Sequence, residues 1–229
     1  MNNLDESLLA NIPPFRKLGQ GQIREILDCA APKRFEAGTL VFEEGLDADR
    51  FYLLLDGHVR VVRTTPDGEQ VTALYISSGQ LFGIAAALGR NQYPATALTA
   101  DECLTLSWPT RLWQEFVEKY DGFATENYKA VGARVDEMNN RIVEMATQQV
   151  EQRIACALLR LVNQAGKKVS NGVEIDFPIT RQNISEMTGT TLHTVSRLLS
   201  AWEKAGIVAS ERRKIVVTNP HQLVLLSGT

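Results

Sequence analysis

Residues 180–200 read "TRQNISEMTGTTLHTVSRLLS", and this stretch decides how the C-terminal region folds. Thr180 can cap a helix whose inward-facing residues are Ile184 and Met187. Gly189 then supplies the permissive backbone that a tight turn between two helices needs. A second helix with apolar residues at helical spacing follows directly. The pattern predicts a helix-turn-helix.

The second helix of this motif has a polar edge opposite its apolar side. Thr190 or Thr191 can cap its start. Four apolar residues fall on one side: Leu192, Val195, Leu198 and Leu199. Four hydrogen-bonding residues, spaced 3, 1 and 3 apart, form a continuous stripe on the other: His193, Ser196, Arg197 and Ser200. A polar stripe on such a helix is typical of one that reads base edges in a major groove.

The side chains of this stripe have distinct chemical roles towards DNA. Arg197 can fork to the O6 and N7 atoms of a guanine, and His193 can donate to a purine N7 or a phosphate. A hairpin with a basic tip follows the motif and makes it winged, which places further cations where phosphates run. The alternative for each lone cation is a solvated surface charge. The predicted DNA surface comprises Thr180, Arg181, Thr190, Thr191, Leu192, His193, Thr194, Ser196, Arg197, Ser200, Arg212, Arg213 and Lys214.

The charge of the chain is distributed unevenly. Its 229 residues have a net charge of −3. From residue 148 onward, ten Lys and Arg residues outnumber six Asp and Glu residues, whereas residues 1–147 have a net charge of −7. A basic region joined to an acidic one indicates that the C-terminal part meets a polyanion such as double-stranded DNA.

Residues 33–108 are predicted to form β-structure. Runs rich in β-forming residues, such as "FYLLL" and "VTALYI", alternate with turn signals such as Pro66-Asp67-Gly68. Turns that recur about every 8–12 residues are typical of a sandwich or barrel. Within this region "FYLLLDGHVRVVR" (51–63) is predicted to be a hairpin with Asp-Gly at its tip. In the C-terminal region, "KVSNGVEI" (168–175) is predicted to be a hairpin with an Asn-Gly turn.

Residues 110–147 change to a helical period. Their apolar positions, spaced alternately three and four apart, are Tyr128, Val131, Val135, Met138, Ile142 and Met145. This is the seam of a coiled coil, and it favours a parallel homodimer over an amphipathic helix that lies on its own domain. The flanking positions provide no opposite-charge pairing for a partner helix: Arg134, Asn139, Arg141 and Ala146.

Several classes of protein are disfavoured by composition. Three widely spaced cysteines without a CxxC pair argue against a disulfide framework, a zinc ribbon and an iron–sulfur cluster. We expect no membrane-spanning segment and no secretory signal in "MNNLDESLLA", hence a cytoplasmic protein. A cupin-like β-roll enzyme would need clustered His and Glu ligands, but only His58 among the three histidines lies in the β-region. We therefore expect a protein that is not an enzyme.

Two stretches together resemble the CRP/FNR family of bacterial transcription regulators. They are "PITRQNISEMTGTTLHTVSRLLSAWEKAGIV" (178–208) and "FEAGTLVFEEGLDADRFYLLLDGHVRVVRTTPDGEQV" (35–71). The resemblance implies an α+β chain that contains an N-terminal β-roll, a double-stranded β-helix like those that bind cyclic nucleotides. A long dimerisation helix and a C-terminal winged helix-turn-helix follow it. We expect an effector-sensing domain with an N-terminal helix over residues 1–110, the dimerisation helix and linker over 111–147, and the DNA-binding domain over 148–229.

The resemblance is incomplete at two sites. In the family the reading helix usually has a Glu where this chain has His193, which implies a different half-site. The family's cyclic-nucleotide binders hold the ribose with a Glu and the phosphate with an Arg, and here Ile84 and Pro94 stand at those positions in "FGIAAALGRNQYPATA" (82–97). Arg90 lies in the same loop, but not at the position of the family's Arg. The effector pocket implied by this cassette comprises Gly83, Ile84, Tyr93, Pro94 and Thr96, with a core role for Tyr93 as the alternative.

Within the family, "GRNQYPATA" (89–97) and the His193 replacement resemble the nitrogen-oxide-responsive, NnrR-like and DNR-like branch. That branch implies an activator of denitrification genes that responds to nitric oxide. It also implies haem as a candidate cofactor, although the metal ligands stay unknown. A regulator that responds to a cyclic nucleotide or another small molecule is the alternative. By analogy with the family, the acidic sensor region, including "TTPDGEQ" (64–70), is a candidate contact for RNA polymerase.

Overall fold

The computed structural model describes residues 5–228. Residues 1–4, part of the stretch predicted not to be a secretory signal, lie outside the described residues. The chain divides into two compact units. The first contains the residues up to Val62 together with Leu74–Glu137, and the second contains Arg63–Ala73 together with the residues from Met138 onward.

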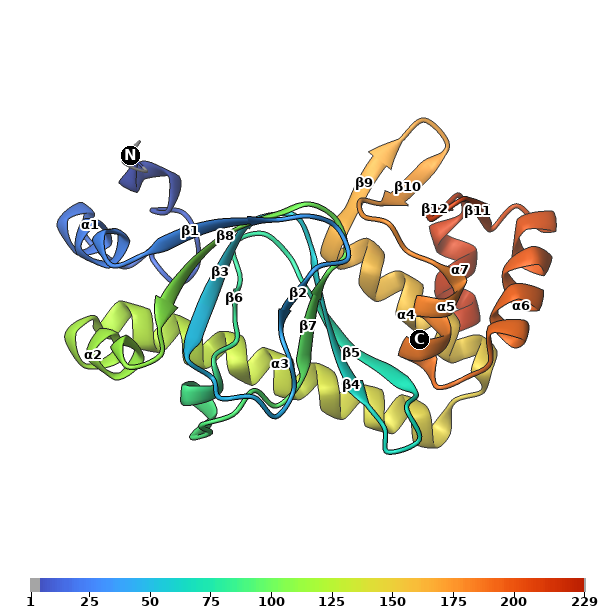
Figure 1. Ribbon diagram of the computed structural model, residues 1–229. Coiled ribbons are helices and arrows are strands. Elements are labelled where there is room, and N and C mark those ends of the chain that lie inside the picture. The colour runs from blue at the N-terminus through green and yellow to red at the C-terminus, as the bar shows by residue number, and fades with distance from the viewer. Residues whose placement is uncertain (1–4, 229) are drawn as a thin grey trace. The chain divides into compact units, whose positions relative to one another are not determined.

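Strands β1 to β8 form two four-stranded antiparallel sheets, which confirms the β-roll implied by the family resemblance (Figure 1). Their strand orders are β1-β8-β3-β6 and β2-β7-β4-β5. The strands are β1 (Ala31–Phe35), β2 (Leu40–Phe42), β3 (Arg50–Asp56), β4 (Val59–Thr64), β5 (Gln70–Ile76), β6 (Leu81–Phe82), β7 (Thr96–Thr99) and β8 (Cys103–Pro109).

The predicted hairpin at Asp56-Gly57 is wrong. Strand β3 pairs with β8 and β6, whereas β4 pairs with β7 in the other sheet. Gly57, at φ +89°, turns the chain from one sheet to the other, and a Cβ there would lie 2.3 Å from the carbonyl oxygen of Glu102. An Asp-Gly pair between two β-runs signals a turn, but the local sequence does not say whether the two strands then pair.

Aromatic side chains fill the core between the first sheet and the helices that cover it. Phe51 stacks on Trp108 with ring centroids 5.4 Å apart, and the edge of Trp113 meets Phe51 at 5.2 Å. Trp113 belongs to α2 (Leu112–Lys119), and the Trp108 indole donates a 2.8 Å hydrogen bond to the carbonyl of Ile26 in α1 (Gln20–Asp28). The roll and both helices therefore share one core.

The predicted dimerisation region forms two helices. Tyr120, with φ −127° and ψ 85°, ends α2, and α3 follows as Asp121–Thr147. Tyr120 is buried, and its hydroxyl donates to the carboxylate of Glu25 at 2.6 Å. The break has its cause in packing against α1, which the heptad pattern does not register.

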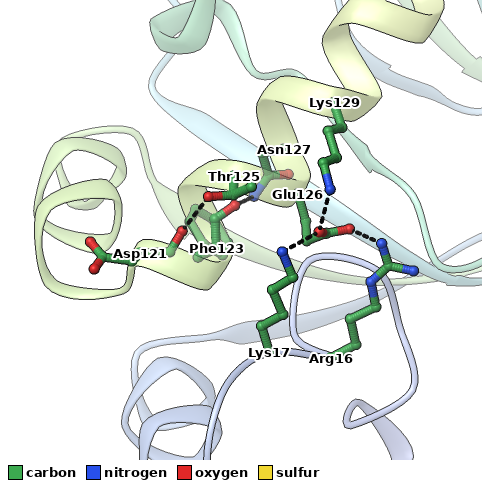
Figure 2. Close-up of polar contacts among 8 residues, drawn as sticks. All are labelled: Arg16, Lys17, Asp121, Phe123, Thr125, Glu126, Asn127 and Lys129. Carbon is green, nitrogen blue, oxygen red and sulfur yellow. Dashed lines mark hydrogen bonds and ion pairs between the residues drawn. The ribbon is translucent and has the colours of Figure 1, made fainter.

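A buried carboxylate joins α3 to the segment before α1 (Figure 2). Glu126 is 3% exposed and binds Arg16, the Lys17 ammonium at 3.0 Å and the Lys129 ammonium at 3.3 Å. The hydrogen bond from Lys17, followed by those of the other cations, lowers the pKa of Glu126 from 4.5 to about 2 against the opposing effect of burial. The ionised form is therefore the one that holds the two segments together.

Replacement of Glu126 by Gln should lower the melting temperature at neutral pH, because three cations then lose their shared anion. Because the pKa of Glu126 is lower in the folded protein, the stabilisation from its ionised form is complete above the ordinary pKa of 4.5. That stabilisation is lost as the pH falls towards 2. The difference between Glu126→Gln and the wild type, followed by circular dichroism, should therefore shrink over that window. Asp136→Asn, an exposed change on the same helix, is the control. A pH-independent difference would contradict the ion-pair explanation.

Helices and a small sheet form the second unit. The sheet has the order β11-β12-β10-β9, and its strands are antiparallel. Helix α4 packs against α5 and α7, and α5 packs against α6. The elements are α4 (Val150–Ala165), β9 (Gly166–Val169), β10 (Gly172–Ile175), α5 (Arg181–Thr188), α6 (Leu192–Lys204), β11 (Val208–Glu211), β12 (Lys214–Val217) and α7 (Pro220–Ser227).

The hairpin β9–β10 is present, but its turn lies one residue earlier than predicted. Gly172 pairs with Val169, so Ser170 and Asn171 form the loop. Gly172, at φ +150°, is needed because a Cβ there would lie 2.2 Å from the carbonyl oxygen of Val217 on β12. The glycine serves the close approach of a neighbouring strand rather than the turn itself.

The predicted seam of α3 is largely open to solvent. The exposed fractions are 53% for Tyr128, 48% for Val135, 49% for Met138 and 65% for Ile142. Val131 packs partly against the core of the first unit. A row of exposed apolar side chains on one helix face indicates an interaction surface. None of the described helices has the length and apolarity required to cross a membrane.

Candidate nucleic-acid interface

Both helices of the predicted helix-turn-helix form, with the predicted caps. Thr180 caps α5 by accepting from the Asn183 amide at 3.1 Å, and Thr191 caps α6 by accepting from the Thr194 amide at 3.2 Å. Gly189 lies between them in the left-handed region, with φ +59° and ψ 42°. The local sequence thus determines where each helix starts and where the chain turns.

The apolar side of α6 differs from the predicted one in two places. Val195 and Leu199 are fully buried and Trp202 is 3% exposed, whereas Leu198 is only half-buried. Leu192 is 47% exposed, so it does not belong to the core. It lies in the first turn of α6, before the helix meets the rest of its domain. Its exposure suits an apolar contact with a thymine methyl group.

The polar stripe of α6 is accessible. His193 and Arg197 are exposed, and Ser196 and Ser200 are half-buried. Within the described residues, the Arg197 guanidinium has neither a hydrogen-bond nor an ion-pair partner. A guanidinium that is neither paired nor covered keeps all five donors for a bidentate contact. The stripe therefore has the chemistry and the access required to read bases.

Two residues of the predicted DNA surface already have partners in their own domain. Arg181 donates to Glu203 at 3.2 Å and to Ser210 at 3.3 Å, which joins the start of α5 to the end of α6 and to β11. The Thr180 hydroxyl donates to Asn183 at 2.8 Å in addition to its capping role. These side chains position the motif, and a phosphate would have to compete for them.

Strands β11 and β12 form the predicted wing. The register pairs Glu211 with Lys214, which leaves Arg212 and Arg213 at the tip, both exposed. Arg213 has φ +63°, the only described residue other than glycine with a positive φ. Lys214 pairs with Glu174 of β10 at 3.3 Å. The tip thus presents two adjacent guanidinium groups on a strained turn.

The predicted effector cassette lies in the first unit, and an aromatic ring fills the space beside it. Gly83 has φ +65°, and a Cβ there would lie 3.0 Å from a ring atom of Phe42. The Phe42 ring also stacks on Tyr93, with centroids 3.9 Å apart and planes at 12°. Phe42 thus brings the two ends of the cassette together. Ile84 is buried among the core residues of the roll.

Tyr93 takes the core role that the sequence left open as an alternative. It is 3% exposed, and its hydroxyl donates to the Arg50 carbonyl at 2.7 Å. Burial, followed by the electrostatic effect of Tyr52, raises its pKa, so the phenol stays protonated. The Thr96 hydroxyl accepts from the Glu44 amide at 3.0 Å, and Pro94 beside Tyr93 is half-buried. The cassette is therefore bonded largely to its own domain.

The histidines do not form a metal centre. His58 is largely buried in the roll, where its Nδ1 lies 2.8 Å from Asp101 Oδ2 and its side chain is 15% exposed. His193 lies on α6 and His221 on α7. Across residues 5–228, no group of three or more His, Cys, Asp or Glu side chains could hold a metal ion.

Sequence reasoning missed two arginines on α3. Arg134 and Arg141 were treated as flanking positions of the seam without a partner. In the structure Arg134 donates to the Leu81 carbonyl at 2.6 Å, and Arg141 donates to several backbone carbonyls. Only the absence of opposite charges at these positions could have hinted that both side chains turn to their own chain.

Two family models match the chain in the same order as these features. A cyclic nucleotide-binding domain matches residues 32–120, and a Crp-like helix-turn-helix domain matches residues 152–226. A β-roll followed by a winged helix-turn-helix defines a class of DNA-binding transcription regulators. The chain belongs to the CRP/FNR family of these regulators, and it is not an enzyme.

Relatives and solved structures agree with this assignment. The chain is 27% identical to the "Global nitrogen regulator" of Synechococcus elongatus over 90% of this chain and 91% of the relative. It is 21% identical to the "CRP-like cAMP-activated global transcriptional regulator" of Mycobacterium tuberculosis over 95% and 97%. FixK2 from Bradyrhizobium japonicum has the same fold, with a TM-score of 0.77, 20% identity and coverage of 87% and 98%.

Replacement of Arg213 by Gly separates the fold of the wing from its charge. A glycine adopts the positive φ without the strain of a side chain, so thermal stability should stay the same or rise by up to ~1 kcal/mol. DNA affinity should fall, and its salt dependence should weaken by about one counterion. Titration of a labelled duplex at several salt concentrations measures both effects. An unchanged dependence of DNA affinity on salt concentration would show that Arg213 does not contact a phosphate.

Proposed function

We propose that this regulator acts as a homodimer on an inverted-repeat operator, with α6 of each subunit in the major groove. The observation that supports this most strongly is the uncovered polar stripe of α6, with the unpaired Arg197 at its centre. A symmetric dimer presents two such helices, which must lie about 34 Å apart to enter successive grooves on one face of the duplex. The operator half-site differs from that of relatives with a Glu in place of His193, because an imidazole donor does not accept from a cytosine amine.

Replacement of Arg197 by Ala tests the reading of bases. The loss of a bidentate contact to guanine should cost ~1–3 kcal/mol on the cognate duplex and relax the preference at one base pair. Lys204→Ala removes the same charge from the exposed end of α6, outside the stripe, and should leave sequence preference intact. Fluorescence anisotropy with cognate and scrambled duplexes measures both. An equal loss on the two duplexes would make Arg197 a phosphate contact only.

The open seam of α3 supports the dimer. Besides the exposed side chains of the seam, a groove of about 530 Å³ lies beside Met138, Ile142 and Met145, and Val71 forms part of its wall. Its lining is mostly apolar. The occupant that matches this chemistry and the alternating three-and-four spacing is the same helix of a second copy. A monomer would leave these side chains in water.

Replacement of Met138 by Asp should dissociate the dimer. Two carboxylates would face each other in an apolar seam, which should raise the dissociation constant by at least ~100-fold, or about 2.7 kcal/mol. Asn140→Asp adds the same charge at an exposed position off the seam and should keep the dimer. Sedimentation equilibrium measures the association. Operator binding by Met138→Asp should decline together with the dimer. If Met138→Asp remains a dimer, the seam of α3 is not the dimer interface.

For the effector we propose a nitrogen oxide, with nitric oxide as the first candidate and control of denitrification-type genes as the outcome. Ile84 and Pro94 replace the two polar residues that would hold a cyclic nucleotide, and Phe42 and Tyr93 occupy space beside the cassette. A relative described as a global nitrogen regulator is consistent with this role. The competing candidate is a cyclic nucleotide, which the match to the cyclic nucleotide-binding domain and the cAMP-activated relative favour.

Two measurements on the full-length protein decide between these effectors. Calorimetry with cyclic AMP should show no micromolar binding, because no carboxylate or guanidinium stands at the matching positions of the cassette. Operator affinity measured with and without nitric oxide under anaerobic conditions should change. An absorption spectrum with and without added haem tests whether haem binds. Contact of the tip of the β4–β5 hairpin, residues 64–70, with RNA polymerase is a further proposal, and crosslinking tests it.

A further inference from the structure

Two arginines on α3 bond to backbone carbonyls of their own chain. Arg134 and Arg141 are seven residues apart and therefore lie on the same face of the helix. Arg134 reaches one carbonyl, that of Leu81 on β6, at 2.6 Å. Arg141 reaches the Thr72 carbonyl at 2.9 Å, the Ala73 carbonyl, and the Met187 carbonyl at 2.9 Å. Arg141 therefore joins β5 to α5, two elements that are far apart in sequence, whereas Arg134 bonds to a single strand.

The acceptors of Arg141 are a helix-end carbonyl and two carbonyls of an edge strand. Met187 lies in the last turn of α5, where carbonyl groups have no amide one turn ahead. Thr72 and Ala73 belong to β5, an edge strand of its sheet, and because consecutive carbonyls of a strand point to opposite sides, one of the two faces away from β4. A guanidinium offers five donors in one plane and can satisfy such groups from both elements at once. Gln at this position would reach at most some of them.

A second polar contact joins the same two elements. The Thr72 hydroxyl is fully buried and donates to the Glu186 carboxylate of α5 at 3.3 Å. Gln182 donates to the other carboxylate oxygen of Glu186 at 3.1 Å. The residues of the β4–β5 hairpin that belong to the second unit are thus attached to α5 at its last turn through both Arg141 and Thr72.

The same part of α3 also contacts the turn of the helix-turn-helix. A Cβ on Gly189 would lie 3.5 Å from the Sδ and Cε atoms of Met145. One turn of α3 therefore separates the contact with the end of α5 from the contact with the turn that precedes α6. This part of α3 therefore contacts both the end of α5 and the turn between α5 and α6.

The hairpin is a direct continuation of the strand beside the effector cassette. In the register of β4 and β7, Val62 is the partner of Thr96. Arg63, the first residue assigned to the second unit, follows Val62 directly. The hairpin that accepts from Arg141 therefore continues the strand that pairs with the end of the cassette.

We infer that Arg141 is a positioning residue for DNA recognition: its guanidinium joins the β4–β5 hairpin to the last turn of α5 and so sets the orientation of the reading helix. It does not touch DNA. The inference rests on the proposed function for its DNA readout, but the attachment of α5 to the hairpin is measurable without DNA.

The test compares Arg141→Gln and Arg141→Lys with the matched control Arg134→Gln in the full-length protein. Hydrogen–deuterium exchange over residues 181–190 reports the attachment of α5, and anisotropy with the cognate duplex reports recognition. Arg141→Gln should speed exchange in α5 by ~10-fold, because a charged group leaves an orphan carbonyl, and should weaken cognate binding. Arg141→Lys should restore part of both. Arg134→Gln should change neither, although it lowers thermal stability.

A double-mutant cycle with Thr72→Val makes the test specific to the hairpin. If the hairpin and α5 act as one attachment, the effects of Arg141→Gln and Thr72→Val on α5 exchange should be non-additive. Equal exchange in Arg141→Gln and Arg134→Gln would overturn the inference, because both would then only destabilise α3. If the wild type binds no duplex, the proposed function fails, while the exchange data still decide on Arg141.

Discussion

Helix α6 has to satisfy two opposite demands, and the DNA-binding unit is organised around that constraint. Val195, Leu199 and Trp202 must be buried for the helix to be held firmly, yet the adjacent edge must remain bare. The solution uses partners that lie away from that edge. Arg181 bonds to Glu203 and Ser210, and the Trp202 indole donates to Glu151 at 3.1 Å. The domain thereby fixes the helix without covering its polar stripe.

In the first unit, residues of the predicted effector cassette contribute to the packing of the roll. Positions that hold an anionic ligand in nucleotide-binding members have apolar residues here, and Phe42 connects Gly83 with Tyr93. Tyr93 keeps its proton and bonds to the Arg50 backbone. The two ends of the cassette are therefore packed into the roll at Ile84, Ala85 and Tyr93, whereas residues 88–92 between them are exposed.

The limits of the sequence are visible in particular residues. The caps at Thr180 and Thr191 and the turn at Gly189 were predictable, because each depends on neighbours a few positions away. The passage of the chain from one sheet to the other at Gly57 and the core role of Phe42 were not predictable, since both depend on strands paired across the roll. Arg141 was missed for the same reason: its acceptors on β5 and α5 are brought together only by the tertiary fold.

Gly172 has an effect on the wing although it lies at the other hairpin. Its missing side chain makes room for the Val217 carbonyl, while Val173 directly beside it pairs with Val217. A slip of β10 by one residue would bring a branched side chain against that carbonyl, so the sheet accepts a single alignment. The alignment of β12 within the sheet is thereby fixed, and this alignment determines how far the basic tip of the wing projects beyond the sheet. A glycine in one hairpin thus fixes where the two arginines at the tip of the other hairpin stand.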